Sequence, residues 1–321
     1  MTRLTFLSAV LPLAALAALA ADTPSPALLV LNKDDATLAI VDPKTNTVVA
    51  RLPTGSQPHE VAVSSDGRSA FVANYATSTL SVADLERQTA RSVDIGPLGG
   101  PHGIVFADGK VYFTAERNQA FARLDPRTNR VDLTVNTGQQ LTHMIWASPD
   151  ARRIVTSNLG SNTISVFDGA APVTIRVGAG PEGFDVSPDG KELWTAHSRD
   201  GGVSIIDLAT RRVTQTLNRL TQQSNRLKFT PDGRRVLISD AANGDLVVLD
   251  AVSRQETRRL RLCRAAFGIL ITPAGDRAYV ACGNDDEVAI VDVRSLTVAG
   301  RFKTGSNPDG MAWAQASPQR K

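Results

Sequence analysis

Residues 57–96 read QPHEVAVSSDGRSAFVANYATSTLSVADLERQTARSVDIG and contain four short runs of alternating apolar and polar residues. The runs are HEVAVSS, SAFVAN, TLSVADL and ARSVDIG, and a period of two is typical of half-buried β-strands. Between the first two runs, SDGR has aspartate and glycine where a type I turn followed by a left-handed residue requires them. The segment therefore predicts a four-stranded antiparallel meander of strands a, b, c and d.

The same unit returns along the chain. His59 follows Pro58 at the start of strand a. The residues at this position in the seven units are His59, His102, His143, Glu182, Asn225, Phe267 and Asp309. They are 43, 41, 39, 43, 42 and 42 residues apart, a period typical of four-stranded propeller blades. The turn returns as SPDAR, SPDGK and TPDGR, and an aspartate ends strand c in every unit. We interpret both features as scaffold, because every blade needs them.

The two ends of the chain complement each other. Residues 28–52 supply strands b, c and d of one unit, whereas GMAWA, residues 310–314, supplies an unaccompanied strand a. Pairing the two would close a ring and remove its free sheet edges. We predict an all-β, seven-bladed propeller over residues 28–316, after a linker at 22–27 and before a polar tail at 317–321.

Residues 1–21 are predicted to be a cleaved secretory signal peptide. Arg3 is followed by an apolar run from Leu4 to Leu19 and by small residues, the usual arrangement of such a signal. We therefore expect a periplasmic or secreted monomer with no membrane span after cleavage. Removing Arg3 lowers the formal net charge of +3 to +2, and 5% of residues are aromatic. Both values disfavour a nucleic-acid-binding propeller, which is the weakest alternative.

Two longer segments carry a family resemblance. SSDGRSAFVANYATSTLSVADLERQT and TPAGDRAYVACGNDDEVAIVDVRSLTVAGRFKTGSNPDG resemble the YVTN family of β-propeller repeats. The resemblance implies a bacterial, extracytoplasmic, seven-bladed protein. It does not select one function, because the family includes surface proteins and relatives of cofactor-handling propellers.

The histidines indicate which face of the ring acts. In a four-stranded meander the start of strand a and the end of strand b lie at the same end of the blade, so all four histidines belong to one rim. We predict a ligand site at this mouth of the channel. Its candidate residues are His59, His102, His143, Glu182, Asn225, Asp309, Asn74, Asn158, His197 and Asp240.

The histidine cluster has three interpretations. The first is a binding or accessory protein that presents a site for a small ligand, a cofactor or a partner protein. The second is a metal site for zinc or copper made by His59, His102, His143 and Glu182, in a lyase or lactone hydrolase. The third is packing alone, because each histidine lies on the same face of its strand as apolar residues, so that its side chain would point between blades. No catalytic residue is assigned.

Cys263 and Cys282 fall on the same rim, one after a strand d and the other at the end of the next strand b. In an oxidising compartment they are predicted to form a disulfide. A thiolate ligand from Cys282, suited to copper, is the alternative.

Overall fold

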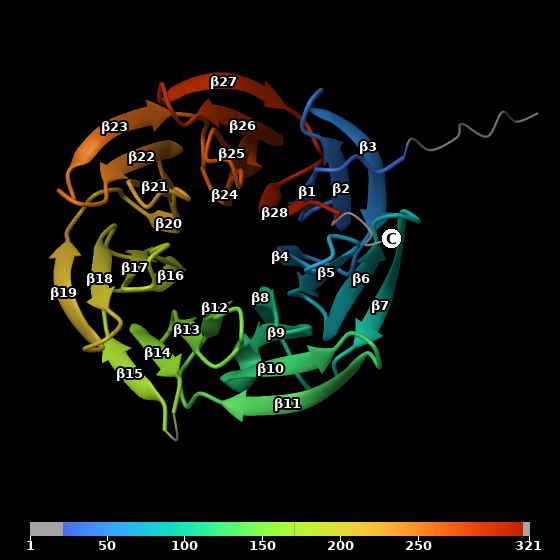
Figure 1. Ribbon diagram of the computed structural model, residues 1–321, viewed down its shortest axis with the longest axis horizontal. Helices are drawn as coiled ribbons and strands as arrows, with labels where there is room; N and C mark the ends of the chain where they lie inside the picture. The colour runs from blue at the N-terminus through green and yellow to red at the C-terminus, as the bar shows by residue number, and fades with distance from the viewer. Residues whose placement is uncertain (1–21, 170, 317–321) are drawn as a thin grey trace, which may run out of the picture.

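The computed structural model describes residues 22–169 and 171–316, which form seven four-stranded antiparallel sheets arranged radially as blades around a central channel (Figure 1). The all-β, seven-bladed prediction is confirmed. The predicted signal peptide and polar tail lie outside the described residues. Two single-turn 3-10 helices, η1 (Glu116–Asn118) and η2 (Gly283–Asp285), follow β9 and β25. Within the described ranges, no helix has the length and apolar character needed to cross a bilayer.

The blades are numbered in chain order. Blade 1 consists of β28 (Pro308–Ala314), β1 (Ala27–Asn32), β2 (Thr37–Asp42) and β3 (Thr47–Pro53). Blade 2 consists of β4 (Pro58–Val63), β5 (Ser69–Asn74), β6 (Thr79–Asp84) and β7 (Thr89–Asp94). Blade 3 consists of β8 (Pro101–Ala107), β9 (Lys110–Ala115), β10 (Ala120–Asp125) and β11 (Arg130–Asn136). Blade 4 consists of β12 (Thr142–Ala147), β13 (Ile154–Asn158), β14 (Thr163–Phe167) and β15 (Val173–Arg176).

The remaining blades follow the same order from the channel outward. Blade 5 consists of β16 (Pro181–Val186), β17 (Glu192–His197), β18 (Val203–Asp207) and β19 (Arg212–Leu217). Blade 6 consists of β20 (Ser224–Phe229), β21 (Arg235–Asp240), β22 (Asp245–Asp250) and β23 (Glu256–Arg261). Blade 7 consists of β24 (Ile269–Ile271), β25 (Arg277–Cys282), β26 (Glu287–Asp292) and β27 (Thr297–Phe302).

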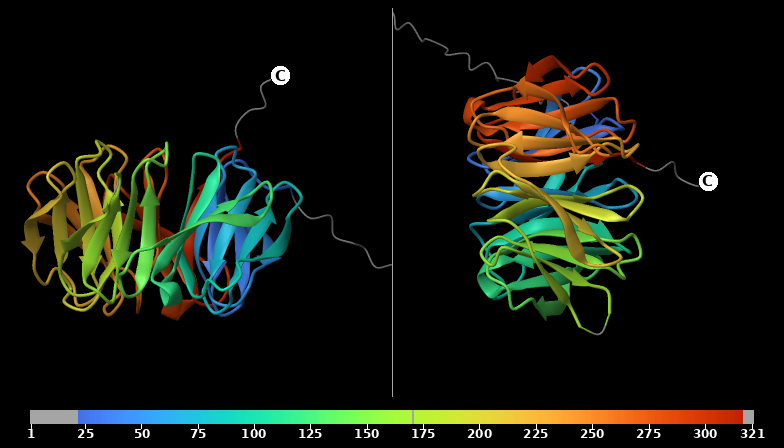
Figure 2. Two further views of the ribbon diagram at one scale, coloured as in Figure 1. Left: turned by 90° about the horizontal axis from the view of Figure 1, so that it is seen from below. Right: turned by 90° about the vertical axis from the view of Figure 1, so that its left-hand side faces the viewer.

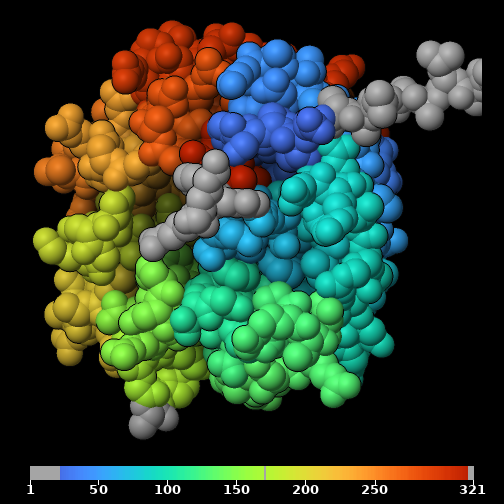
Figure 3. Space-filling view, turned by 45° about the vertical axis from the view of Figure 1, so that its right-hand side comes forward, coloured from blue at the N-terminus to red at the C-terminus, as the bar shows by residue number. Residues whose placement is uncertain are grey.

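Blade 1 closes the ring with strands from both ends of the chain. Strand β28 pairs antiparallel with β1, with Leu28 opposite Trp313 and Val30 opposite Met311. The blue N-terminal and red C-terminal parts pack side by side in Figure 3. The predicted closure is confirmed, and strand β28 begins two residues before GMAWA.

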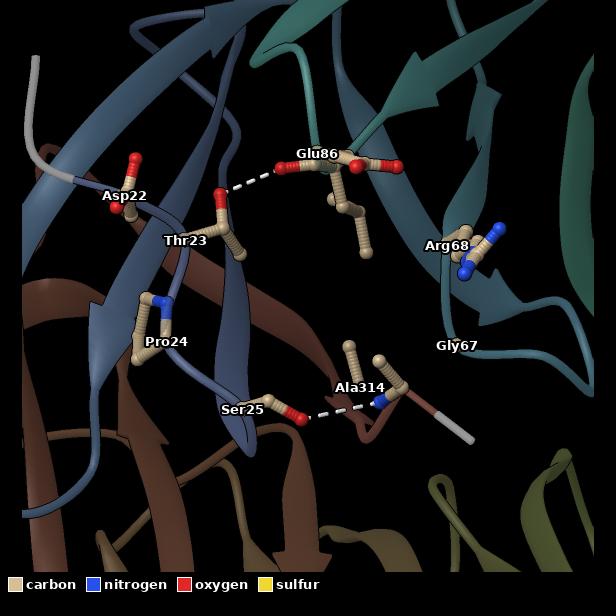
Figure 4. A pocket seen from close by; sticks show the side chains of 10 residues that line it. Asp22, Thr23, Pro24, Ser25, Gly67, Arg68, Glu86 and Ala314 are labelled. Carbon is tan, nitrogen blue, oxygen red and sulfur yellow. Dashed lines mark hydrogen bonds between the residues drawn. The ribbon is translucent and has the colours of Figure 1, made fainter. Parts of the chain in front are cut away.

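Thr23 and Ser25, in the segment that precedes β1, are hydrogen-bonded to blade 2 and to the residue Ala316 that follows β28. The Thr23 hydroxyl donates to the Leu85 carbonyl of blade 2, and Ser25 Oγ accepts from the Ala316 amide at 3.2 Å. Around these contacts, shown in Figure 4, lies a pocket of about 420 Å³. The segment predicted as a linker therefore lies across the seam between blades 1 and 2.

The hydrophobic core is divided among the blade interfaces. A separate buried cluster fills each of the seven contacts between neighbouring blades. The three inner strands supply nearly all of these side chains, as in β5, where Ala70 to Asn74 are all buried. Because each sheet is covered on both faces, its inner strands are apolar on both faces.

The connections between strands lie at the two faces of the ring, which Figure 2 shows edge-on. In the turn between β4 and β5, the Ser64 hydroxyl donates to Asp66 at 2.6 Å and Gly67 adopts φ +73°. Such a-to-b turns lie at one face. The d-to-a connections and the starts of the innermost strands lie at the other, which we call the histidine face.

Candidate functional site

The histidine face contains a pocket of about 330 Å³ at the mouth of the central channel. Six of the predicted residues line it, namely His59, His102, His143, Glu182, Asn225 and Asp309. The other lining residues are Lys33, Tyr75, Glu116, Leu141, Leu159, Arg226 and Phe267.

Glycines bring the innermost strands close together. Gly103, Gly183, Gly268 and Gly310 each directly follow the mouth residue of their blade. A Cβ on Gly103 would lie 2.7 Å from the His143 carbonyl oxygen, and one on Gly310 would lie 2.1 Å from that of His59. Real Cβ atoms do not approach so closely, so these positions need glycine. The close approach places the mouth side chains of adjacent blades beside one another.

Three imidazoles from blades 2, 3 and 4 form a continuous row. The ring centroids of His59 and His102 are 4.7 Å apart, and those of His102 and His143 are 3.8 Å apart. The Tyr75 ring lies beside the first two imidazoles, 5.0 Å from His59 and 5.8 Å from His102. The row therefore combines residues more than 80 positions apart in sequence into one aromatic, nitrogen-bearing wall.

His143 is held between two carboxylates. Its Nδ1 bonds Glu116 Oε1, and its Nε2 lies 2.9 Å from Glu182 Oε1. Burial alone would lower the pKa of His143, but the two carboxylates raise it to about 9. His143 is therefore an imidazolium at neutral pH, with both nitrogens occupied.

The network continues into blade 6. The Arg226 guanidinium donates to Glu182 Oε1 at 3.2 Å. Burial opposes ionisation of Glu182, yet His143 and Arg226 together lower its pKa to about 2. Tyr75 completes the other end by donating to Glu116 Oε2 at 2.9 Å. These charges are thus balanced against one another within the mouth.

His59 and His102 have the opposite protonation. Burial lowers the pKa of His59 and lowers that of His102 well below its ordinary value, helped in His102 by the charge of His143. His59 Nδ1–H donates to the Gln57 carbonyl at 2.9 Å, so its Nε2 carries the free lone pair. Both rings are neutral at neutral pH.

Two polar atoms in the pocket lining have no partner. His102 Nδ1 and Asp309 Oδ1 are buried and make no hydrogen bond in the described part of the chain. The other Asp309 oxygen lies 3.1 Å from Lys33 Nζ. Burial would raise the pKa of Asp309, but Lys33 and Arg226 lower it. An unpartnered buried polar atom is costly, so these two mark places where a ligand would satisfy the protein.

The four residues of the predicted metal site, His59, His102, His143 and Glu182, all line this pocket, and the site stays a prediction. Among residues 22–169 and 171–316, no three His, Cys, Asp or Glu side chains are grouped so as to hold a metal ion. The reason is that His143 has no free nitrogen and Glu182 is already shared between His143 and Arg226.

Asn74, Asn158 and Asp240 lie on the predicted rim but do not line the pocket. Asn74 Nδ2 donates to Thr79 Oγ1 and to Ser81 Oγ, each at 3.0 Å, and Asn158 makes the equivalent contacts. Asp240 accepts from the backbone amides of Gln222 and Gln223. These three residues instead hold the loops at the ends of their strands.

In four blades, the residue one position after the end of strand b reaches the mouth. Lys33, Tyr75, Glu116 and Leu159 follow the last residue of strand b in blades 1 to 4 and line the pocket. Successive side chains in a strand point to opposite faces, so a shift of one residue separates a structural amide from a pocket residue. That alternation was the available sequence signal.

His197 is also absent from the pocket. It is fully buried at the end of β17, where its Nδ1 lies 3.1 Å from Asp200 Oδ1. Burial lowers its pKa.

The predicted disulfide is present: Cys263 and Cys282, with Cα atoms 5.9 Å apart, join blade 6 to blade 7. Cys282 is therefore not a free thiolate ligand.

Comparisons with known proteins agree with the fold. A family profile described as cytochrome D1 heme domain matches residues 106–281, more than half of the chain. A second, described as YNCE-like β-propeller, matches residues 3–125. The chain is 23% identical over 308 residues to the uncharacterized protein YwhL of Bacillus subtilis, covering 90% of this chain and 65% of that protein. The chain thus spans somewhat less than two thirds of that relative.

Two solved structures share the architecture. The periplasmic gluconolactonase PpgL of Pseudomonas aeruginosa superposes with a TM-score of 0.71 at 18% identity, covering 92% of this chain and 100% of that chain. The dihydro-heme d1 dehydrogenase NirN, in complex with DHE, gives a TM-score of 0.66 at 15% identity, covering 89% of this chain and 74% of that one. At these identities the likeness establishes the propeller fold alone. The closer YVTN resemblance stays a prediction.

Proposed function

The chain belongs to the cytochrome D1 heme domain family, and we propose that it is an exported binding protein that holds a small molecule or cofactor in the histidine pocket. The observation that carries this proposal is the pair of buried, unpartnered polar atoms, His102 Nδ1 and Asp309 Oδ1, in the pocket lining. A rigid ring that presents such groups binds with little loss of protein entropy.

The pocket offers several kinds of contact to a ligand. Lys33 has further N–H donors beyond its contact with Asp309, and His59 Nε2 is an acceptor. Phe267 supplies an apolar wall, with the Lys33 ammonium 5.0 Å from its ring centroid. A volume of about 330 Å³ is at the lower end for small-molecule sites, so a ligand as large as a heme would extend beyond the pocket.

The family relationship favours a heme-type cofactor as the ligand, and one residue fits it. Histidines that bind metals commonly donate Nδ1–H to a carbonyl and present Nε2 to the metal, which is the arrangement of His59 and Gln57. A single imidazole suffices as the axial ligand of heme iron, so a cluster of three ligands is not required. His59 would hold the iron, and Lys33 would contact acidic groups of the cofactor. The bound iron would supply redox or electron-transfer chemistry.

The test is an absorbance titration with hemin, followed at the Soret band. We expect saturable binding by the wild-type protein and at least a tenfold loss of affinity in His59→Ala. His197→Ala is the matched control, because it removes a histidine outside the pocket and should bind as wild type, once thermal unfolding shows that it is folded.

The outcomes separate the two forms of the proposal. Equal binding by wild type and His59→Ala rejects His59 as the ligand. If hemin does not bind, the cofactor form is rejected, and native mass spectrometry of protein purified from its own host tests the small-molecule form. The small-molecule form predicts a bound mass that is present on the wild-type protein and absent from His102→Ala. If no such mass is found, the pocket is rejected as a binding site.

Export is the second part of the proposal. The disulfide supports an oxidising compartment, and the residues at 1–21 have the composition of a signal peptide. We expect the protein in the periplasmic or extracellular fraction as a monomer, with a mature N-terminus near Asp22. Edman sequencing and light scattering test this, and an intact Met1 in the mature protein would contradict it.

A further inference from the structure

A second pocket, of about 380 Å³, lies on the opposite face from the histidines, at the seam between blade 7 and blade 1. It is lined by Arg277 and Tyr279 of β25, Trp313 of β28, the β24–β25 turn with Pro273, and the β2–β3 turn with Pro43 and Lys44. We propose that this seam pocket is a binding site for small planar aromatic carboxylates.

One side of the pocket suits an aromatic ring. Trp313 is half-buried, and its ring lies 6.4 Å from that of Tyr279 at an interplanar angle of 29°. Pro26, Pro43 and Pro273 also line the pocket. Aromatic rings prefer offset, near-parallel contacts of this kind, and the prolines add stiff apolar surface. A planar apolar ligand would therefore displace water from the indole face.

The other side suits an anion. The Tyr279 hydroxyl is buried and has no hydrogen-bond partner in the described part of the chain. Arg277 lies close enough to oppose the rise in the pKa of Tyr279 that burial causes. However, its guanidinium donates to the Pro43 carbonyl at 3.3 Å and makes no hydrogen bond of good geometry to the hydroxyl. One carboxylate oxygen could accept from both groups.

The pocket lining carries two cationic side chains, Arg277 and Lys44, and one carboxylate, Asp276. Arg277 and Lys44 are exposed and form no ion pair among the described residues. The nearby carboxylate of Asp276 accepts the Thr272 hydroxyl at 2.6 Å. Charge-assisted hydrogen bonds to a carboxylate are stronger than neutral ones, so an aromatic acid fits better than a neutral aromatic molecule. Because the two pockets lie on opposite faces, this site does not depend on the function proposed for the histidines.

The test uses 2-naphthoate as the probe, measured by isothermal titration calorimetry and by quenching of tryptophan fluorescence. We expect 2-naphthoate to bind at least tenfold more tightly than its neutral amide, 2-naphthamide, and than cyclohexanecarboxylate, which lacks the aromatic ring. Tyr279→Phe and Arg277→Gln should each weaken binding about tenfold or more, since each removes a hydrogen bond to a charged group.

Arg234→Gln is the matched control, because Arg234 is exposed on the equivalent turn of blade 6. Both Arg234→Gln and His59→Ala, which changes the other pocket, should bind 2-naphthoate as the wild-type protein does. Arg277→Gln changes an exposed side chain, so it remains informative if Tyr279→Phe is less stable. Equal affinity for naphthoate and naphthamide would overturn the proposal. So would a wild-type affinity in Arg277→Gln, or no detectable naphthoate binding by the wild-type protein.

Discussion

Arg226 reaches Glu60 across the central channel, with its Nη2 2.7 Å and its Nε 3.1 Å from Glu60 Oε1. Arg226 belongs to β20 of blade 6 and Glu60 to β4 of blade 2, which lie on opposite sides of the channel (Figure 1). The contacts run from Tyr75 of blade 2 through Glu116, His143, Glu182 and Arg226 to Glu60, which again belongs to blade 2. The channel is crossed by charged side chains at the histidine face.

We expect Arg226→Met to lower the free energy of unfolding by about 3 to 5 kcal/mol. It leaves the Glu60 carboxylate without its ion-pair partner and removes one of the two partners of Glu182, which keeps His143. Equilibrium unfolding in urea measures the change. Arg258→Met is the control on an exposed outer strand and should cost less than about 0.5 kcal/mol. Equal stability of the two variants would show that the ion pair across the channel contributes nothing.

Stability should fall between pH 6.5 and pH 9.5. The pKa of His143 is raised from 6.5 to about 9 in the folded protein, so protonation stabilises the fold fully below pH 6.5 and is lost as the pH rises through about 9. Chemical unfolding at several pH values measures this slope. His143→Gln cannot titrate and should flatten it; an unchanged slope in that variant would assign the effect to another group.

Reduction of the disulfide should lower stability by about 3 kcal/mol, since Cys263 and Cys282 are 19 residues apart and closing a loop of that size restricts the unfolded chain. Thermal unfolding with and without dithiothreitol measures the effect. The double variant Cys263→Ser/Cys282→Ser is expected to unfold early and to ignore the reductant. A reductant effect that persists in this variant would contradict the assignment.

Gly103→Ala should destabilise the protein and disturb the mouth together. The new Cβ would lie 2.7 Å from the His143 carbonyl oxygen and from the Met144 Cα, so the neighbouring strand must move. Gly300→Ala is the control, because its Cβ would meet its nearest neighbour at 3.6 Å, an ordinary contact. Gly103→Ala should lower both the melting temperature and the affinity for hemin. Gly300→Ala should change neither.

Much of the fold was readable from local pattern. Alternation within each run and the SDGR-type turns repeat at short range, so they predict strands, blades and even the closure by residues 310–314 without any tertiary information. The starts of the innermost strands were equally readable, and six predicted residues line the pocket.

The contents of the pocket depended on tertiary structure. Asn74 and Tyr75 are neighbours in sequence, yet one is tied to Ser81 and the other bonds Glu116 of the next blade. His59, His102 and His143 occupy equivalent positions in the repeat. Only His143 has a carboxylate against each of its two ring nitrogens, so it alone of the three is charged. Repeat periodicity determines where a side chain starts, because backbone geometry is local. Protonation and ligand affinity are decided by what other blades place within a few ångströms, and the chain order does not specify that.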